Sequence, residues 1–369
     1  MPSKLFHGLL TSVLCLWVVA AAQNTNPQRQ QTDYFGSSGG NIKDSTSDKC
    51  CSGTLGSLLT DGTKKFILSN NHVLGLLGKA TPGDPISQPG LIDTACATPR
   101  AVAKFTAAPP LSSNVDAAIA EILEGKMDSE GKILSIGQPS NSTVAPVAGL
   151  SVLKSGRTTG LTAGSIQTYP TNLKVDYSGG CKSEGPSDAP FTDLMVIEGK
   201  SSAFSAGGDS GSLVVTETSH SPVGLLFAGN DSLTLATPIG PVLNELSKVY
   251  GHPLTFLGSK QASIQVQSEN AAAPQNTQAT SAMNQLSERI LSNPAILGVG
   301  VAKRTEDQRN PVLIVYVERG KATAATGAAG ITFSAQGGTE YHGVATKIIE
   351  TEPFRAYGWN EIERPESCH

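Results

Sequence analysis

Residues 50–258 consist of short apolar runs separated by turn residues, and this pattern restricts the fold more than any other feature of the sequence. Apolar runs of about four to eight residues are typical of strands and shorter than most helices. Residues 54–59 and 65–69 flank Asp61-Gly62, a pair that favours a β-hairpin. The pattern therefore predicts paired β-barrels, with further strands at residues 101–105, 117–122, 151–154, 161–167, 194–198, 212–216, 223–228 and 234–237 and a closing helix at 241–248.

The charge balance of the chain excludes several classes of protein. Lys and Arg number 27 against 31 Asp and Glu, and no basic cluster stands out, so we expect no binding to nucleic acid. Charged residues make up only 16% of the chain, whereas there are 39 Gly and 22 Pro. This composition argues against a coiled coil and favours short strands joined by turns.

The N-terminus carries the features of an export signal. Lys4 precedes an apolar run over residues 9–22, and Ala20 and Ala22 satisfy the small-residue rule for signal peptidase, so the mature chain is predicted to begin at Gln23. The alternative is a membrane anchor, but the run is shorter than the roughly 20 residues that a spanning helix needs. We expect a secreted or periplasmic protein without a stable membrane anchor.

Export makes disulfide bonds plausible, because the compartments outside the cytosol are oxidising. The mature chain keeps an odd number of cysteines, so at least one thiol is predicted to stay free or to pair between chains. Adjacent cysteines rarely pair with each other, and the sequence leaves the pairing open. No Cys-x-x-Cys and no histidine pair at metal spacing occurs, so no metal site is predicted; the five cysteines are Cys50, Cys51, Cys96, Cys181 and Cys368.

The composition changes along the chain and suggests separate regions. After the signal peptide at 1–22, residues 23–49 are polar and are predicted to form a flexible leader. Residues 259–282 are of low complexity and are predicted to be a linker. Beyond them, a helix at 283–291 and strands at 296–302, 312–318 and 344–350 predict a small α+β domain over 283–358, followed by a tail at 359–369.

The most specific chemical signal is the glycine-rich segment Gly207-Gly-Asp-Ser-Gly-Ser around Ser210. A serine hydroxyl becomes a nucleophile when a neighbouring base removes its proton, and the resulting oxyanion needs hydrogen-bond donors. Glycines around Ser210 let the amides of Gly208 and Ser210 turn towards one small space. The alternative is a turn in which Gly and Asp serve only the loop.

The partners of such a serine can be sought among the few suitable residues. Of the histidines in the mature chain, only His72 directly follows a predicted strand, which suits a side chain held at a cleft; the alternative is a core histidine. Asp116 stands just before an apolar strand and is a candidate for orienting the imidazole, the alternative being a strand-capping residue. The three residues occur in the order His, Asp, Ser.

These segments resemble those of a known family. Ser69-Asn-Asn-His-Val, Asn114-Val-Asp-Ala-Ala-Ile-Ala and Gly207-Gly-Asp-Ser-Gly-Ser are similar to the motifs of chymotrypsin-fold serine proteases. Residues 154–166 resemble a strand pair of bacterial members such as alpha-lytic protease, and the whole of 50–258 is most similar to bacterial relatives of the plant NARROW LEAF trypsin-like proteases. The resemblance implies two six-stranded antiparallel β-barrels for this region.

The resemblance also implies roles for individual residues. Ser210 would be the nucleophile, His72 the general base and then acid, and Asp116 the orienting carboxylate, with the amides of Gly208 and Ser210 forming the oxyanion hole. Asp209 would pair with Arg157, which would replace the new N-terminus used by animal trypsins. No insertion of Gln23 or of another N-terminus is therefore expected.

The resemblance places the substrate pocket between two short segments. Phe204–Gly207 and Phe227-Ala228-Gly229 would bound it. Phe204 stands where trypsins keep the acid that recognises Arg or Lys, so an apolar or small residue is expected before the cleaved bond.

The sequence therefore predicts an exported serine endopeptidase that acts on protein or peptide substrates and needs no cofactor. The alternatives are a catalytically silent binding module on the same fold and a serine esterase. The C-terminal domain is interpreted as a chaperone or inhibitor acting in cis, as a docking domain, or as a passive stabilising cap.

Overall fold

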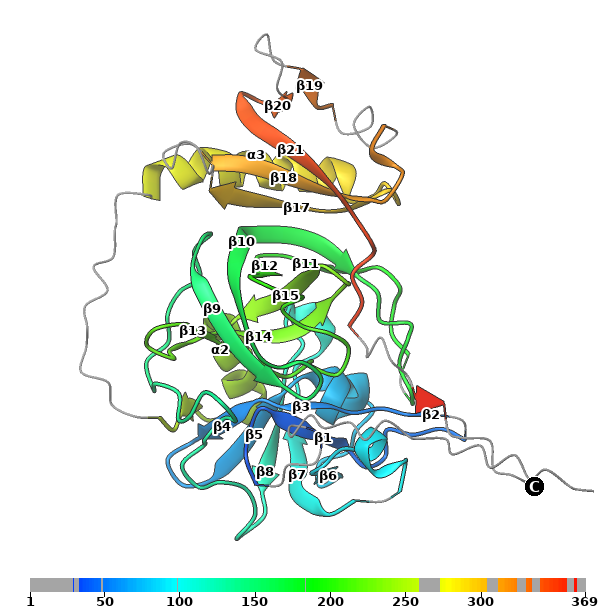
Figure 1. Ribbon diagram of the computed structural model, residues 1–369, viewed down its shortest axis with the longest axis vertical. Coiled ribbons are helices and arrows are strands. Elements are labelled where there is room, and N and C mark those ends of the chain that lie inside the picture. The colour runs from blue at the N-terminus through cyan, green and yellow to red at the C-terminus, as the bar shows by residue number, and fades with distance from the viewer. Residues whose placement is uncertain are drawn as a thin grey trace, which may run out of the picture.

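A computed structural model describes residues 29, 33–47, 49–97, 99–182, 184–258, 273–303, 311–323, 330–333, 339–356 and 362–363. The predicted signal peptide, Cys368 and much of the predicted linker and tail lie outside these residues. The chain is mainly β with few helices, and its strands form two large sheets (Figure 1). Among the described residues, neither long helix combines the length and apolar content that crossing a bilayer requires.

The N-terminal sheet has eight strands and curls upon itself, in the order β16-β4-β5-β8-β7-β6-β1-β3. The chain links one end of the sheet to the other side, because only Gly56 separates the end strand β3 from β4, the strand next to β16. A Cβ atom at residue 56 would lie 1.9 Å from the carbonyl oxygen of Gly211, so a glycine is required where the strand bends against that loop. The strands are β1 (Ser37–Asn41), β3 (Gly53–Leu55), β4 (Ser57–Thr60), β5 (Lys65–Ser69), β6 (Pro85–Ser87), β7 (Ala101–Ala107), β8 (Ala118–Ile122) and β16 (Thr255–Phe256).

A closed six-stranded barrel follows, in which every strand pairs with two neighbours in the ring β9-β10-β12-β15-β14-β13. The helix α2 (Ile239–Tyr250) follows the last strand, close to where a helix was predicted. Paired barrels are thus confirmed in part, as one closed barrel and one curled sheet. The barrel strands are β9 (Ser151–Gly156), β10 (Gly160–Val175), β12 (Met195–Gly199), β13 (Leu213–Thr216), β14 (Pro222–Gly229) and β15 (Leu233–Pro238), with β11 (Ala189–Phe191) added beside β10.

The C-terminal module continues the barrel sheet. Strand β10 is 16 residues long, and its second half pairs with β17, so the two units share one sheet (Figure 1). A Cβ atom at residue 300 would lie 2.4 Å from Thr171 Oγ1, which explains why a glycine stands at this pairing. Helix α3 (Ala273–Ile290) covers the module, whose strands are β17 (Ile296–Lys303), β18 (Pro311–Glu318), β19 (Thr332–Phe333), β20 (Thr339–Tyr341) and β21 (Val344–Thr351).

Two predictions about the polar regions were wrong. Ser37–Asn41, expected in the flexible leader, form the wholly buried β1, which pairs with β3 and β6. The small side chains of this segment allow a close approach, since a Cβ atom at residue 39 would lie 2.4 Å from Leu55 Cγ. Helix α3 begins at Ala273, inside the predicted linker, because Ala279 and Ala282 extend its buried apolar face.

Two disulfide bonds settle the pairing that the sequence left open for four cysteines. Cys50 pairs with Cys96 and Cys51 with Cys181, so the adjacent cysteines lead to different partners. The second bond joins residues 130 positions apart and ties the N-terminal sheet to the loop after β10. Lys49–Cys50 also form the short β2, which pairs with β22 (Ile362–Glu363).

Candidate active site

His72 lies in a single helical turn that follows β5, and Asp116 stands two residues before the start of β8, the strand that pairs with β5. Because the end of β5 lies beside the start of the antiparallel β8, the two side chains meet: His72 Nδ1 lies 2.5 Å from Asp116 Oδ2. The main-chain amide of His72 also donates to Asp116 Oδ1 at 3.2 Å. The exposed fraction is 4% for His72 and zero for Asp116, so the imidazole is held in one orientation by a buried carboxylate.

A third group completes the surroundings of Asp116. The hydroxyl of Tyr177, which is fully buried, donates to Asp116 Oδ2 at 2.8 Å. The Asn70 side chain donates to the main-chain carbonyl of Asp116 at 2.6 Å. A buried carboxylate is tolerated when several donors satisfy it, so these contacts explain how Asp116 stands unexposed before an apolar strand.

Ser210 reaches the same region from the barrel. It lies in the loop before β13, and its carbonyl oxygen accepts the amide of Thr54 in β3 at 2.8 Å. A Cβ atom at residue 53 would lie 2.6 Å from Val73 Cγ2 and 2.9 Å from the Ser210 carbonyl oxygen. The turn carrying His72 and the loop carrying Ser210 therefore meet against β3. The structure pairs the predicted base with the predicted carboxylate, whereas the printed partners of the Ser210 hydroxyl are the carbonyls of Phe227 and Ala356.

The loop around Ser210 contains the two amides that were predicted to form an oxyanion hole. Gly208 has a φ of +93°, which side-chain-bearing residues rarely adopt. Its carbonyl turns away and accepts the hydroxyl of Thr54 at 2.9 Å. Within the described part of the chain, the amides of Gly208 and Ser210 donate to no other group, whereas Asp209, Gly211 and Ser212 amides are all bonded.

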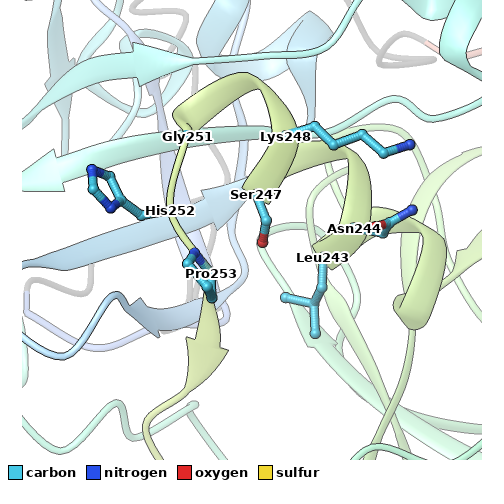
Figure 2. Close-up of a pocket in the computed structure, with 7 residues that line it drawn as sticks. All are labelled: Leu243, Asn244, Ser247, Lys248, Gly251, His252 and Pro253. Carbon is cyan, nitrogen blue, oxygen red and sulfur yellow. The ribbon is translucent and has the colours of Figure 1, made fainter.

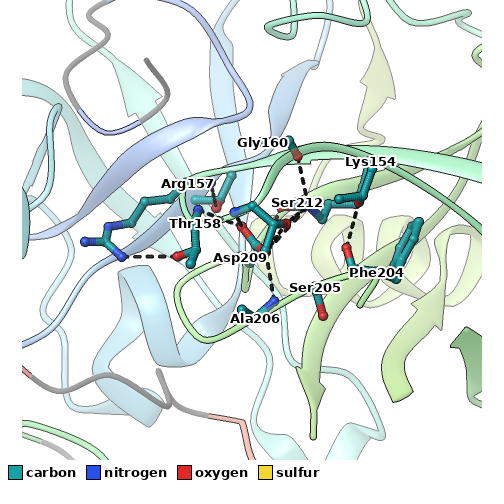
Figure 3. Close-up of polar contacts among 12 residues, drawn as sticks. Lys154, Arg157, Thr158, Gly160, Phe204, Ser205, Ala206, Asp209 and Ser212 are labelled. Carbon is teal, nitrogen blue, oxygen red and sulfur yellow. Dashed lines mark hydrogen bonds and ion pairs between the residues drawn. The ribbon is translucent and has the colours of Figure 1, made fainter. Parts of the chain in front are cut away.

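Asp209 is fully buried and holds this loop in place (Figure 3). Its carboxylate accepts the amides of Thr158 at 2.8 Å and Ala206 at 2.9 Å, and the hydroxyl of Thr159 at 2.7 Å. Lys154 Nζ lies 3.5 Å from Asp209 Oδ2 and donates to the carbonyl of Gly160 at 2.9 Å. The counter-charge of Asp209 thus comes from inside the barrel.

The predicted ion pair between Arg157 and Asp209 is wrong. The Arg157 guanidinium forms two parallel hydrogen bonds of 2.7 Å to the carboxylate of Asp93, and in Figure 3 it points away from Asp209. The position of Lys154 explains the difference. Lys154 is fully buried on β9 and occupies the place beside Asp209, which leaves Arg157 to Asp93 in the short turn between β6 and β7.

The residues of the predicted substrate pocket lie in different places: some are in the barrel core, and others are beside Ser210. The side chain of Phe204 is 1% exposed and packs in the barrel core, so it does not bound a pocket with its ring. The carbonyl of Gly207 accepts the hydroxyl of Thr158 at 2.6 Å and supports the Ser210 loop. Phe227, Ala228 and Gly229 end β14 beside Ser210, whose hydroxyl donates to the Phe227 carbonyl at 3.3 Å.

A surface hollow at the end of α2 does not belong to this site. Figure 2 shows its lining, which consists of Leu243, Asn244, Ser247, Lys248, Gly251, His252 and Pro253. None of the predicted catalytic residues is among them.

Three supporting residues were not identified from the sequence: Tyr177, Lys154 and Asp93. Lys154 carries the only local signal, a lysine at an inward position of a predicted strand. Tyr177 and Asp93 lie on irregular segments 61 and 64 residues from the partners they bind, and nothing in the local sequence marks them.

Known proteins support the resemblance drawn from the motifs. Residues 108–236 match the family model described as Nal1 C-terminal domain, that is, the NARROW LEAF family. The matched segment includes Asp116 and Ser210 but not His72. No curated protein matches the sequence.

Solved structures of serine proteases are also similar at low identity. Thermobifida fusca Protease A is 18% identical, with a TM-score of 0.42 over 62% of this chain and 100% of its own. A glutamic acid specific serine protease is 18% identical, with a TM-score of 0.41 over 60% of this chain and 99% of its own. Cellulomonas bogoriensis chymotrypsin is 18% identical, with a TM-score of 0.37 over 56% and 91%. The fold itself is mainly β, with one closed six-stranded barrel and one curled sheet.

Proposed function

We propose that the protein is an exported serine endopeptidase with the two-barrel architecture of the chymotrypsin fold. The observation that carries the proposal is the buried chain of contacts from Tyr177 through Asp116 to His72. The turn that carries His72 and the loop that carries Ser210 both approach Gly53 of β3, which supports a common site. Two disulfide bonds agree with an oxidising compartment, and so with secretion or a periplasmic location.

In the proposed reaction, His72 Nε2 takes the proton of Ser210 Oγ while the oxygen attacks the carbonyl carbon of a peptide bond. Asp116 accepts the Nδ1 proton of His72 and stabilises the imidazolium that forms. The amides of Gly208 and Ser210 donate to the oxyanion. His72 then protonates the departing amine, and a water molecule, activated by the same imidazole, hydrolyses the acyl-enzyme.

The contacts of Asp209 support a loop that is ready for catalysis. Its carboxylate accepts donors from residues 158, 159 and 206 and lies beside Lys154, so the donors come from within the chain. An oxyanion hole works because its donors are already oriented when charge develops. No cleavage that creates a new N-terminus is needed, and no cofactor takes part.

Cleavage of an unfolded protein tests the proposal. Wild type, Ser210→Ala and His72→Ala would be incubated with a reduced, alkylated protein, and the new peptide termini identified by mass spectrometry. Ser202→Ala serves as the matched control, because Ser202 is an exposed serine of the same loop region. We expect internal cleavage, after apolar or small residues, by wild type and the control alone. Hydrolysis of simple esters without peptide cleavage would indicate an esterase, and no hydrolysis of either would contradict the proposal.

A further inference from the structure

The segment that follows β21 lies between two main-chain edges at the active site. Arg355 and Gly229 exchange both main-chain hydrogen bonds, at 2.8 and 3.0 Å. On the other side, the amide of Asp176 donates to the carbonyl of Phe354 at 2.9 Å, and the amide of Ala356 donates to the carbonyl of Asp176 at 3.0 Å. Three consecutive residues are therefore bound as an extended strand inserted between the ends of β10 and β14.

This strand ends on the proposed nucleophile. Ser210 Oγ donates to the carbonyl oxygen of Ala356 at 3.2 Å. The carbonyl of Phe227 lies 3.3 Å from the same oxygen and is the alternative acceptor for its single proton. Phe227 belongs to β14, the strand that Arg355 joins at Gly229. The segment thus covers both the hydroxyl of Ser210 and the neighbouring edge that an extended peptide would need.

One side chain anchors the segment. Phe354 is 1% exposed and belongs to the buried cluster that contains Tyr177, Phe191 and Phe227. Its ring meets that of Tyr316 edge-on, with centroids 6.0 Å apart. By contrast, the side chain of Arg355 is 64% exposed. The position of Phe354 selects an aromatic residue, and the next position holds an exposed side chain whose Nε lies 3.9 Å from Asp176 Oδ2.

The segment is also fixed where it leaves the C-terminal module. The side-chain amide of Asn230, just beyond β14, donates to Thr351 Oγ1 at 2.9 Å and to the carbonyl of Glu352 at 2.7 Å. Thr351 is the last residue of β21, so the module delivers the chain to the cleft at a defined point (Figure 1).

We propose that residues 351–356 are a tethered occupant of the substrate cleft, and that a substrate peptide must displace them before it reaches Ser210. Strand addition uses main-chain hydrogen bonds for affinity and side-chain pockets for specificity, and both are present here. Because the occupant is part of the same chain, it competes at an effective concentration on the order of millimolar. That residues 351–356 inhibit peptide cleavage rests on the proposed function, whereas their docking in the cleft does not.

The occupant also indicates which peptides compete with it. The cleft takes an extended chain with an aromatic residue at the position of Phe354, any residue that tolerates solvent at the next, and a small residue at the position of Ala356. Peptides lacking the aromatic residue lose the buried contacts and compete poorly.

Binding of a fluorescent peptide with the sequence of residues 351–356 tests the docking without relying on catalysis. In the full-length protein, Phe354→Ala is expected to expose the cleft and to bind the peptide at least tenfold more tightly than wild type. Thr351→Val removes one hydrogen-bond acceptor at nearly constant volume and is expected to act in the same direction by a smaller factor. Tyr341→Ala is the matched control, since Tyr341 is a buried aromatic of the same module in a different cluster.

Hydrogen exchange provides a second readout. The amide of Gly229 donates to Arg355, so it is expected to exchange slowly in wild type and in Tyr341→Ala, and faster in Phe354→Ala. Equal peptide binding by wild type and Phe354→Ala, or equal exchange at Gly229, would overturn the docking.

The rate of Ser210 modification by a fluorophosphonate separates this proposal from the proposed function. Both hold if Phe354→Ala reacts several-fold faster than wild type. If no variant reacts although Phe354→Ala binds the peptide more tightly, the docking stands and the protease function fails. If wild type and Phe354→Ala react equally fast and bind the peptide equally, the function stands and the occupant is rejected.

Discussion

Lys154 Nζ lies 3.5 Å from Asp209 Oδ2, and neither side chain is exposed to solvent. Burial lowers the pKa of Lys154, and the neighbouring Asp209 opposes that shift. A buried pair of this kind adds little net stability compared with apolar residues, but each charge depends on the other. The pair joins the interior of the barrel to the residue that precedes the proposed nucleophile.

Lys154→Met is therefore expected to destabilise the fold by about 3–5 kcal/mol, because it leaves the buried charge of Asp209 without its counter-charge. The double variant Lys154→Met/Asp209→Asn is expected to recover much of this loss, since both charges are removed together. Urea unfolding measures the free energy of each variant. Equal destabilisation by the single and double variants would show that the two charges do not depend on each other.

Asp44 gives rise to a specific pH dependence of stability. Burial raises its pKa from 3.8 to about 6, although the amide of Lys182 donates to its carboxyl group. The folded state thus keeps a proton that the unfolded state has already lost. The stabilisation is fully present below pH 3.8 and is lost as the pH rises through about 6.

Asp44→Asn should remove this dependence, because the amide does not titrate and can still accept the same hydrogen bond. A shift of about two pKa units corresponds to roughly 3 kcal/mol. Unfolding of both proteins between pH 4 and pH 7 is expected to show the variant gaining about that amount relative to wild type. Parallel pH profiles would contradict the assignment.

Asp116→Asn tests the orienting role of the carboxylate. By comparison with the Ser-His-Asp mechanism, kcat is expected to fall about 10⁴-fold with little change in fold, because the amide favours the wrong tautomer of His72. Tyr177→Phe removes a single donor to the same carboxylate, so a loss of up to about tenfold in kcat/KM is expected. Rates of peptide hydrolysis by the two variants show which substitution costs more activity. A larger loss for Tyr177→Phe than for Asp116→Asn would argue against the orienting role of the carboxylate.

The N-terminus should not influence activity. In the part of the chain that the structure describes, the donors to the Asp209 carboxylate come from residues 158, 159 and 206, with Lys154 beside it. Secreted protein beginning at Gln23 and protein carrying several extra residues before it are expected to hydrolyse peptides at equal rates. Activity confined to one defined N-terminus would show that Asp209 needs an external partner.

The sequence predicted those parts of the fold that depend on local patterns. The hairpin around Asp61-Gly62 is β4–β5, and the predicted strand at 344–350 is β21. Local pattern could not show that β10 continues beyond Gln167, because residues 168–173 pair with β17, more than a hundred residues away. Likewise, Ser37–Asn41 are polar in composition, and their burial depends on the close contact of Gly39 with Leu55.

In the candidate site, too, local patterns could be predicted and contacts between distant residues could not. His72, Asp116 and Ser210 each stand beside a strand with a recognisable motif, so they could be predicted. The partner of Arg157 could not, because Asp93 and Asp209 are both acidic and only the fold decides which one lies nearer. Nothing in Phe354-Arg-Ala marks a segment that returns to Ser210, since residues of any type can form the main-chain hydrogen bonds that join it to Gly229 and Asp176.

The central claim is that Ser210 is an activated nucleophile, and intact mass after treatment with a fluorophosphonate tests it most directly. Wild type, Phe354→Ala, Ser210→Ala and the control Ser202→Ala would be treated side by side to completion. We predict one adduct on wild type, Phe354→Ala and Ser202→Ala, and none on Ser210→Ala. No adduct on either wild type or Phe354→Ala, or an adduct that persists on Ser210→Ala, would contradict the account.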